Sequence, residues 1–343
     1  MSQIRLIEPV SPVIFFILSL LWANSVLKSC GRISFIHRNG TRHELTPLIE
    51  AAADRDLHIL NIIVRQGGEI TAEHHFTPEQ RVLLWSASKT FTAMAVGIAQ
   101  GEGRFNVMEP IANYFHTPAD PLWQSVTIRD LLRMGTGQRR CALTQALNAG
   151  QPLTDVEALF FAEPVVDKPG AHFMYNNAAT YMLSKLISLR TGVCLNEYLR
   201  PRVFEPLDIH HVEWTADVSG INFGASGLHL NAHELSKFGQ LLLNGGRWGG
   251  ASLIPAEFIR AATAKQIDNA DFNEPFATAD HRAGYGYQLW MNSLPGSYRL
   301  DGLYGQYVVV IPEKDAVVTF VSNEPKNMVG ILELTWEFVV GQL

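Results

Sequence analysis

The sequence has little cysteine, with only three residues of this type among 343. Cys30, Cys141 and Cys194 are far apart, and no C-x-x-C pair occurs, so their spacing favours neither a disulfide framework nor a thiolate zinc site. The sequence also lacks an H-E-x-x-H motif, and no G-x-G-x-x-G follows a predicted strand. We therefore expect no metal ion and no cofactor.

Histidine occurs twice as an adjacent pair, at His74-His75 and at His210-His211. Neighbouring side chains of a strand point to opposite faces, so the two imidazoles of a pair cannot share one ion there. These pairs give no metal-site prediction.

A long run of charge of one sign is also missing. The chain has 27 Lys and Arg against 33 Asp and Glu, a formal net charge of −6. Without a basic patch there is no reason to expect binding to a phosphate backbone, and we exclude nucleic acid as a partner. The hydrophobic fraction of 47% is ample for a large core, so a globular protein of enzyme size is expected.

One uncharged stretch lies near the N-terminus, from Val10 to Leu27, with Arg5 before it. Its strongly apolar part, Val13 to Trp22, is short compared with the roughly 20 residues that span a bilayer. A signal peptide, a membrane anchor and an N-terminal extension of a cytoplasmic protein remain open. We assign residues 1–44 to this leader and a linker, and any membrane association to this segment.

The remaining residues, 45–343, read as one catalytic domain of the α+β class. Residues 45–56 have helical spacing, and two strands follow that are joined at Gly67-Gly68. Residues 86–280 are predicted to be mostly helical, whereas the C-terminal part predicts strands and then a helix. The expected fold is an antiparallel sheet, formed by residues 45–85 and 281–343 and flanked by N- and C-terminal helices, with a mostly helical insertion.

The first chemical motif is Ser86-Ala87-Ser88-Lys89, at the start of an apolar run. Residues three apart lie on one face of a helix, so Ser86 and Lys89 can meet, and a desolvated lysine can accept the proton of a serine. The same spacing occurs by chance at Ser25 and Lys28, and a serine at a helix start is often only a cap. The pair alone therefore leaves both interpretations open.

Further motifs follow the pair in a fixed order. They are LWSASKTFTAMAVGIAQGEG (84–103), TIRDLLRMGTG (127–137), PGAHFMYNNAATYMLSKLI (169–187) and SGLHLNAHELSKFGQLLLNGGRW (226–248). Together they resemble the serine β-lactamase and penicillin-binding-protein superfamily, and more narrowly its class C-like branch of esterases, D-aminopeptidases and 6-aminohexanoate-dimer hydrolases. The resemblance implies a β-lactamase/transpeptidase-like fold with Ser86 as nucleophile and Lys89 as the lysine of S-x-x-K.

The second motif of this branch, Y-x-N, is matched by Tyr175-Asn176-Asn177. The resemblance makes Tyr175 a proton carrier, and a nearby ammonium is expected to depress its pKa. Asn177 is expected beside Lys89 and the acyl side of the substrate.

The third motif departs from the pattern, because Leu300-Asp301-Gly302 stands where relatives carry K-T-G or H-x-G. Gly302 is expected to let its strand lie close to the substrate. The backbone N–H of Leu303 would form an oxyanion hole with that of Ser86. Leu300 cannot hold a carboxylate, so neutral substrates are favoured.

Two other segments are expected near the site. Ser226 stands in FGASGLHL, which lacks the last glycine of G-x-S-x-G, and is interpreted as part of a bordering loop. The aromatic residues of YGYQLW, including Tyr287 and Trp290, fit the core and the wall of the site, or direct contact with substrate.

These motifs predict a metal-free serine hydrolase, a β-lactamase-related esterase or amidase, that acts through an acyl-enzyme on Ser86. Its expected partner is a small neutral ester or amide. The alternative is a penicillin-binding or β-lactamase-like protein that is acylated with little turnover.

Overall fold

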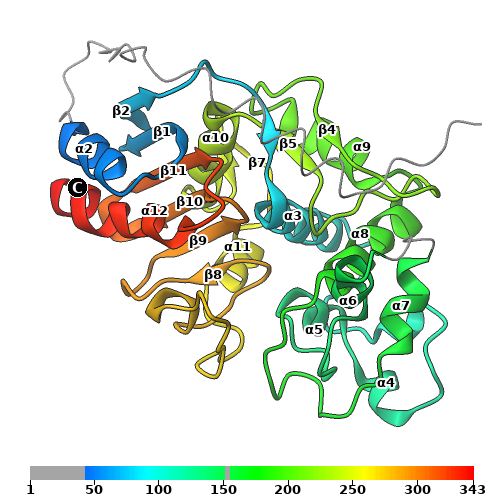
Figure 1. Cartoon of the computed structure of the whole chain (residues 1–343). Helices are drawn as coiled ribbons and strands as arrows, with labels where there is room; N and C mark the ends of the chain where they lie inside the picture. Colours follow the sequence, from blue (N-terminus) through cyan, green and yellow to red (C-terminus); the bar gives the residue numbers. More distant parts are fainter. Residues whose placement is uncertain (1–42, 151–154) are drawn as a thin grey trace, which may run out of the picture.

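The computed structural model describes residues 43–150 and 155–343. The predicted leader therefore lies outside the described residues except for its last two positions. In Figure 1 a central sheet is covered on one side by α2 and α12 and on the other by α3, α10 and α11. Helices α4 to α8 form a second region beside α3. No helix within the described ranges has the length and apolar character that crossing a membrane requires.

The central sheet has six antiparallel strands in the order β2-β1-β11-β10-β9-β8. The strands are β1 (Ile59–Gln66), β2 (Glu69–His75), β8 (Trp290–Met291), β9 (Tyr298–Gly302), β10 (Gln306–Ile311) and β11 (Ala316–Ser322). The pairing of β1 with β11 closes the sheet between the two ends of the chain. This confirms the predicted fold class.

The hairpin from β1 to β2 turns at Gly67 and Gly68, whose φ angles are +61° and +83°. Two consecutive residues with positive φ are what a tight hairpin turn requires, and glycine adopts them without a Cβ penalty. The turn was therefore readable from the sequence.

Each face of the sheet is buried under helices. On one face, side chains such as Val309 and Phe320 pack in a core with side chains of α2 (Thr46–Asp54) and α12 (Met328–Leu334). The other face is covered by α10 (Ala232–Leu243), which approaches closely at a glycine. A Cβ on Gly239 would lie 2.5 Å from Val308 and 2.7 Å from Val317.

The predicted terminal helices match α2 and α12, and α12 continues as the π-helical turn η6 (Thr335–Val339). Between β11 and β10 the chain turns through η5 (Pro312–Lys314).

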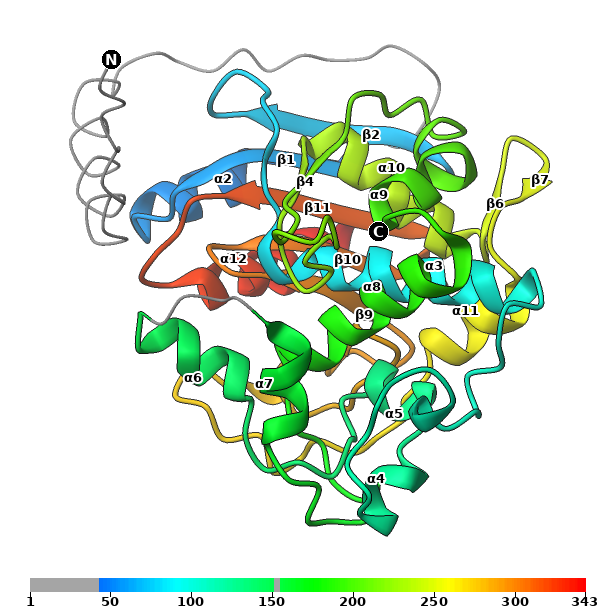
Figure 2. The ribbon, with the colours of Figure 1, turned by 90° about the vertical axis from the view of Figure 1, so that its right-hand side faces the viewer.

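Helix α3 (Ser88–Gly101) is the central helix of the molecule, and all of its residues from Ser88 to Ala99 are buried. On one side α3 faces the central sheet together with α10 and α11 (Ala256–Ala262). On its other side lies the region of helices α4 to α8 (Figure 2). That region contains α4 (Pro121–Ser125), α5 (Ile128–Leu132), α6 (Ala142–Asn148), α7 (Val156–Ala162) and α8 (Asn177–Thr191), with the turn η2 (Ile111–Asn113). Helix α9 (Leu195–Leu199) follows α8, contacts α8 and α3, and continues into the π-helical turn η3 (Arg200–Phe204).

Short strands that the sequence did not predict lie just before and within the mostly helical segment 86–280. β3 (Val82–Leu83), β5 (Leu228–Leu230) and β4 (Glu213–Trp214) form a three-stranded sheet, and β6 (Arg247–Trp248) pairs with β7 (Ala251–Ser252). Strands of two or three residues are too short to show an alternating pattern. The pairing of β3 with β5 brings the loop before Leu228 next to the segment that leads into Ser86.

Candidate active site

Ser86 lies in the turn η1 (Trp85–Ala87), directly before α3. The preceding residue, Trp85, has a φ of +50°, a left-handed conformation that costs a non-glycine residue roughly 1–2 kcal/mol. Its ring packs edge-on against Tyr304, with centroids 5.3 Å apart. A strained turn held by packing thus presents Ser86 at the start of a buried helix.

Lys89 contacts Ser86 directly. Its Nζ donates to Ser86 Oγ at 2.9 Å and to the carbonyl oxygen of Ala225 at 2.8 Å, and only 1% of Lys89 is exposed. The contact with Ser86 follows from the spacing of three on one helical face. The contact with Ala225 places the loop around Ser226 at the edge of this pair, where the sequence analysis expected it.

The environment of Lys89 lowers the pKa of its amine. Burial lowers the pKa of the amine from its ordinary value of 10.5 to about 7, and electrostatic interactions with Cys141 and Asp301 act in the opposite direction. A large fraction of the amine is therefore neutral near pH 7, and a neutral amine can accept a proton.

Tyr175 completes a three-residue arrangement. Lys89 Nζ lies 5.0 Å from the centre of the Tyr175 ring, and the phenol is hydrogen-bonded to Ser86. The ring is stacked on Trp290, with centroids 5.7 Å apart. The structure thus brings Ser86, Lys89 and Tyr175 together.

The expected pKa of Tyr175 is wrong in direction. Burial raises the pKa of the phenol, the hydrogen bond with Ser86 works against this, and the Asp301 carboxylate adds to the rise. Since Lys89 is itself held largely neutral, it cannot provide the full positive charge that would depress the pKa of the phenol. Tyr175 is therefore a protonated phenol across the ordinary pH range.

Asn177 does not contact Lys89 in this structure. It is the first residue of α8, and its amide donates to Thr144 Oγ1 at 3.1 Å. Among the described residues, the polar partners of Lys89 Nζ are Ser86 and Ala225. The middle residue, Asn176, caps α8 by accepting from the N–H groups of Ala178 and Ala179.

Gly302 ends β9 beside the turn that carries Ser86. A Cβ at this position would lie 2.3 Å from the carbonyl oxygen of Leu84. The missing side chain therefore allows a close approach of two protein backbones. The next residue, Leu303, is 42% exposed, so the chain reaches the surface directly after Gly302.

Leu300 and Asp301 lie on opposite faces of β9. Leu300 is fully buried and pairs with Val308, whereas Asp301 pairs with Tyr307. The first residue of the Leu300-Asp301-Gly302 motif is thus a side chain of the core.

Asp301 belongs to an ionic cluster that sequence reasoning missed. Arg299 Nε donates to Asp301 Oδ2 at 2.9 Å, and His281 Nε2 lies 3.5 Å from the same oxygen. Burial alone would raise the pKa of the Asp301 carboxyl, but Arg299 and His281 outweigh it and the pKa is lowered. The carboxylate is therefore ionised and already engaged by the Arg299 guanidinium and the His281 imidazole.

Aromatic residues form the surroundings of Tyr175. Trp290 contacts Tyr175, and it also packs edge-on against Phe173 and Tyr285. Tyr287 packs instead against Phe258, on the α11 side. The alternating aromatic residues around position 290 were a usable signal, but nothing in the sequence distinguished Trp290 from Tyr287.

Known proteins with similar sequences include hydrolases. The model of the family described as Beta-lactamase matches residues 48–337. The 6-aminohexanoate-dimer hydrolase of Paenarthrobacter ureafaciens is 25% identical over 77% of this chain and 72% of its own length. The Beta-lactamase of Escherichia coli (strain K12) is 20% identical over 86% of this chain and 91% of its own.

A solved structure has the same fold. The octameric penicillin-binding protein homologue from Pyrococcus abyssi superposes with a TM-score of 0.68 at 23% identity. The match covers 85% of this chain and 76% of that chain.

Proposed function

Since the chain belongs to the Beta-lactamase family of hydrolases, we propose that it is a serine hydrolase that forms an acyl-enzyme on Ser86 and acts on small neutral esters or amides. The single observation on which this proposal rests is the contact of Lys89 Nζ with Ser86 Oγ at 2.9 Å, in surroundings that lower the pKa of Lys89 to about 7. A neutral amine at that distance is a general base in reach of its proton.

In the acylation step, Ser86 Oγ attacks the carbonyl carbon while its proton moves to Lys89 Nζ. Tyr175, which is protonated in the resting protein, donates its phenolic proton to the leaving oxygen or nitrogen, and the protonated Lys89 then returns a proton to the Tyr175 phenolate directly or through water. In the second step, a water attacks the ester carbonyl and gives a proton to Lys89, and Lys89 passes this proton to Ser86 Oγ as the bond between Oγ and the acyl group breaks.

The negative oxygen that forms during both steps needs hydrogen-bond donors. We assign this role to the backbone N–H groups of Ser86 and Leu303. The close approach of Gly302 to Leu84 supports the assignment, because it brings the end of β9 against the turn of Ser86.

The preference for neutral substrates is supported by two features of β9. Leu300 is buried and carries no charge, and the neighbouring Arg299 guanidinium and His281 imidazole are engaged with Asp301. A charge-assisted hydrogen bond to a substrate carboxylate contributes roughly 1.5–3 kcal/mol where a free cation exists. The name of the Paenarthrobacter ureafaciens relative, a 6-aminohexanoate-dimer hydrolase, supports amides as a second substrate class.

A substrate screen tests the proposal. Wild-type protein should hydrolyse p-nitrophenyl butyrate with a higher kcat/KM than nitrocefin, and Ser86→Ala should abolish both activities. Ser88→Ala is the matched control, because this neighbouring hydroxyl accepts only a long hydrogen bond, at 3.4 Å from Leu228 N. A higher kcat/KM for nitrocefin would reassign the substrate class. Stoichiometric labelling by a fluorescent penicillin without product release would favour the alternative of acylation without turnover.

A further inference from the structure

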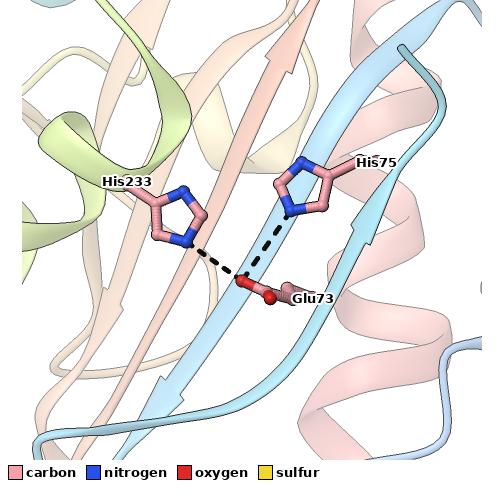
Figure 3. A group of neighbouring side chains, drawn as sticks. All are labelled: Glu73, His75 and His233. Carbon is pink, nitrogen blue, oxygen red and sulfur yellow. Dashed lines mark hydrogen bonds and ion pairs between the residues drawn. The ribbon is translucent and has the colours of Figure 1, made fainter. Parts of the chain in front are cut away.

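A cluster of three metal-binding side chains lies away from Ser86, where the edge strand β2 meets the first turn of α10. Figure 3 shows Glu73 and His75 on β2 and His233 on α10, directed toward one another. Glu73 Oε2 lies 3.0 Å from His233 Nε2 and 3.8 Å from His75 Nε2. One ligand atom from each residue lies within 4.8 Å of the other two.

These separations fit one small ion. Zn²⁺ binds imidazole nitrogen and carboxylate oxygen at about 2.0–2.2 Å, which at tetrahedral angles separates two ligand atoms by about 3.3 Å. The two separations involving Glu73 lie on either side of this value. Two imidazoles and one carboxylate are also donors that suit Zn²⁺ better than Ca²⁺ or Mg²⁺, which prefer oxygen.

We propose that Glu73, His75 and His233 bind one divalent transition-metal ion, Zn²⁺ in the first instance, with water in the remaining position. The site is independent of Ser86 and of the proposed hydrolase chemistry. It joins β2, an edge strand of the central sheet within the described part of the chain, to α10.

The orientation of His233 is set for ligation. Its Nδ1 lies 2.6 Å from Glu79 Oε1, and its backbone N–H donates to the same oxygen at 3.0 Å. A carboxylate that accepts a hydrogen bond from Nδ1–H leaves the lone pair of Nε2 directed at the metal. Such a carboxylate is the usual second partner of a zinc-bound histidine. Nε2 is the atom that faces Glu73.

His75 has a second partner of its own in Asn61. The Asn61 amide lies 2.9 Å from His75 Nδ1, and Asn61 Oδ1 is buried without a hydrogen-bond partner. A half-turn of the amide brings this oxygen to Nδ1–H and leaves His75 Nε2 free to bind the ion. The turn costs the contact of Asn61 with the Thr77 carbonyl, made at 3.1 Å.

The competing arrangement is a protonated His233 paired with two carboxylates and no metal. The hydrogen bond with Glu79 raises the pKa of His233, and burial works in the opposite direction. That arrangement accounts for Glu79 and Glu73 but does not use His75, whose ring lies 5.7 Å from the His233 ring and nearly parallel to it. A metal ion uses all three residues.

Binding of an ion at this site would link two elements of the fold and stabilise the protein. Strand β2 is one edge of the six-stranded sheet, and free edges are open to pairing with other chains. An ion at this site fixes the edge to α10, whose N-terminal cap Asn231 follows β5 directly. We therefore expect Zn²⁺ to raise the melting temperature of the protein and to leave hydrolysis unchanged.

Titration of metal-free, full-length protein with Zn²⁺, in competition with a chromophoric chelator, tests the site. Wild type should bind one equivalent. His75→Ala and His233→Ala should each weaken binding about a hundredfold or more, and Glu79→Gln should weaken it by about ten- to a hundredfold. His210→Ala is the matched control, because His210 forms an exposed pair with a single carboxylate, that of Asp208 at 2.9 Å, and its removal should have no effect.

Co²⁺ gives a readout that needs no variant. Bound to wild type, it should show the intense visible absorption of four-coordinate cobalt, and Zn²⁺ should displace it. Only weak six-coordinate bands, or equal Zn²⁺ affinity in wild type and folded His75→Ala, would overturn the proposal and leave the ion-pair arrangement. Ester hydrolysis by each variant reports whether it is folded.

Discussion

Lys89 has an ionisable side chain and is more deeply buried than Ser86 and Tyr175. Its pKa of about 7 makes it a base near neutral pH, and protonation below that value removes the acceptor for the Ser86 proton. We therefore expect kcat/KM to fall on the acid side with an apparent pKa near 7, about tenfold per pH unit.

On the alkaline side, the raised pKa of Tyr175 predicts no loss of activity up to about pH 9. A pH series with p-nitrophenyl butyrate, corrected for spontaneous hydrolysis, measures both limbs. An acid limb centred near pH 10, the ordinary region for lysine, would contradict the role of Lys89 as the neutral base.

The same burial predicts a cost to stability. Lys89 has a lower pKa in the folded chain than in the unfolded one, so between pH 7 and about pH 10 the unfolded chain binds more protons and stability rises with pH. Lys89→Met removes the ionisable group and should raise the free energy of unfolding at pH 7 by about 1–3 kcal/mol, after the loss of the hydrogen bond to Ala225.

Denaturant unfolding at pH 7 and pH 10 measures this effect. The advantage of Lys89→Met should shrink at the higher pH, where the wild-type chain no longer needs to lose a proton on folding. A variant that is less stable than wild type at both pH values would contradict this, because it would show that the hydrogen bonds of Lys89 offset the cost of burying its amine.

Tyr175 tests the proton route. Tyr175→Phe keeps the ring that stacks on Trp290 and removes only the phenol, so it should lower kcat roughly a hundredfold while the melting temperature stays close to that of wild type. Tyr285→Phe is the matched control, because this ring packs in the same aromatic group, 6.5 Å from Tyr175. Equal kcat in Tyr175→Phe and wild type would remove Tyr175 from the mechanism.

The contact between the end of β9 and the turn η1 depends on one missing side chain. Gly302→Ala would place a methyl group 2.3 Å from the Leu84 carbonyl oxygen, so strand and turn must separate. Such overpacking costs roughly 1–3 kcal/mol, and a shift of Leu303 away from Ser86 should lower kcat more than it raises KM.

Gly341→Ala is the control, since an added Cβ there meets nothing within 4 Å. Thermal unfolding and ester kinetics on both variants make the comparison. Wild-type kinetics in a destabilised Gly302→Ala would separate the packing role of Gly302 from the proposed oxyanion hole.

Elements with a strong local signal were predictable from the sequence. Gly67-Gly68 fixed the first hairpin, and the apolar strands β10 and β11 flank a turn marked by Pro312. The strands β3, β4 and β5 were missed, because two or three residues carry no measurable period and the pairing of β3 with β5 joins residues 146 to 148 positions apart. Yet this small sheet brings Ala225 to Lys89.

Across the molecule, the fold class and the contact of Ser86 with Lys89 followed from the order of motifs and from helix geometry. The direction of the Tyr175 pKa did not, because it depends on burial by residues remote in sequence. The pairing of Asp301 with Arg299 and His281 likewise requires the position of η4 (Ala279–His281) relative to β9. The meeting of His233 with Glu73 spans 160 residues of sequence and has no local signal.

The measurement that tests the central claim most directly is mass spectrometry of the protein after reaction with a fluorophosphonate probe. The account predicts one label per chain, on the peptide that contains Ser86 and at Ser86 itself, with no label in Ser86→Ala. A label on Ser88 or Ser226 in the wild type, together with retained hydrolysis in Ser86→Ala, would contradict it.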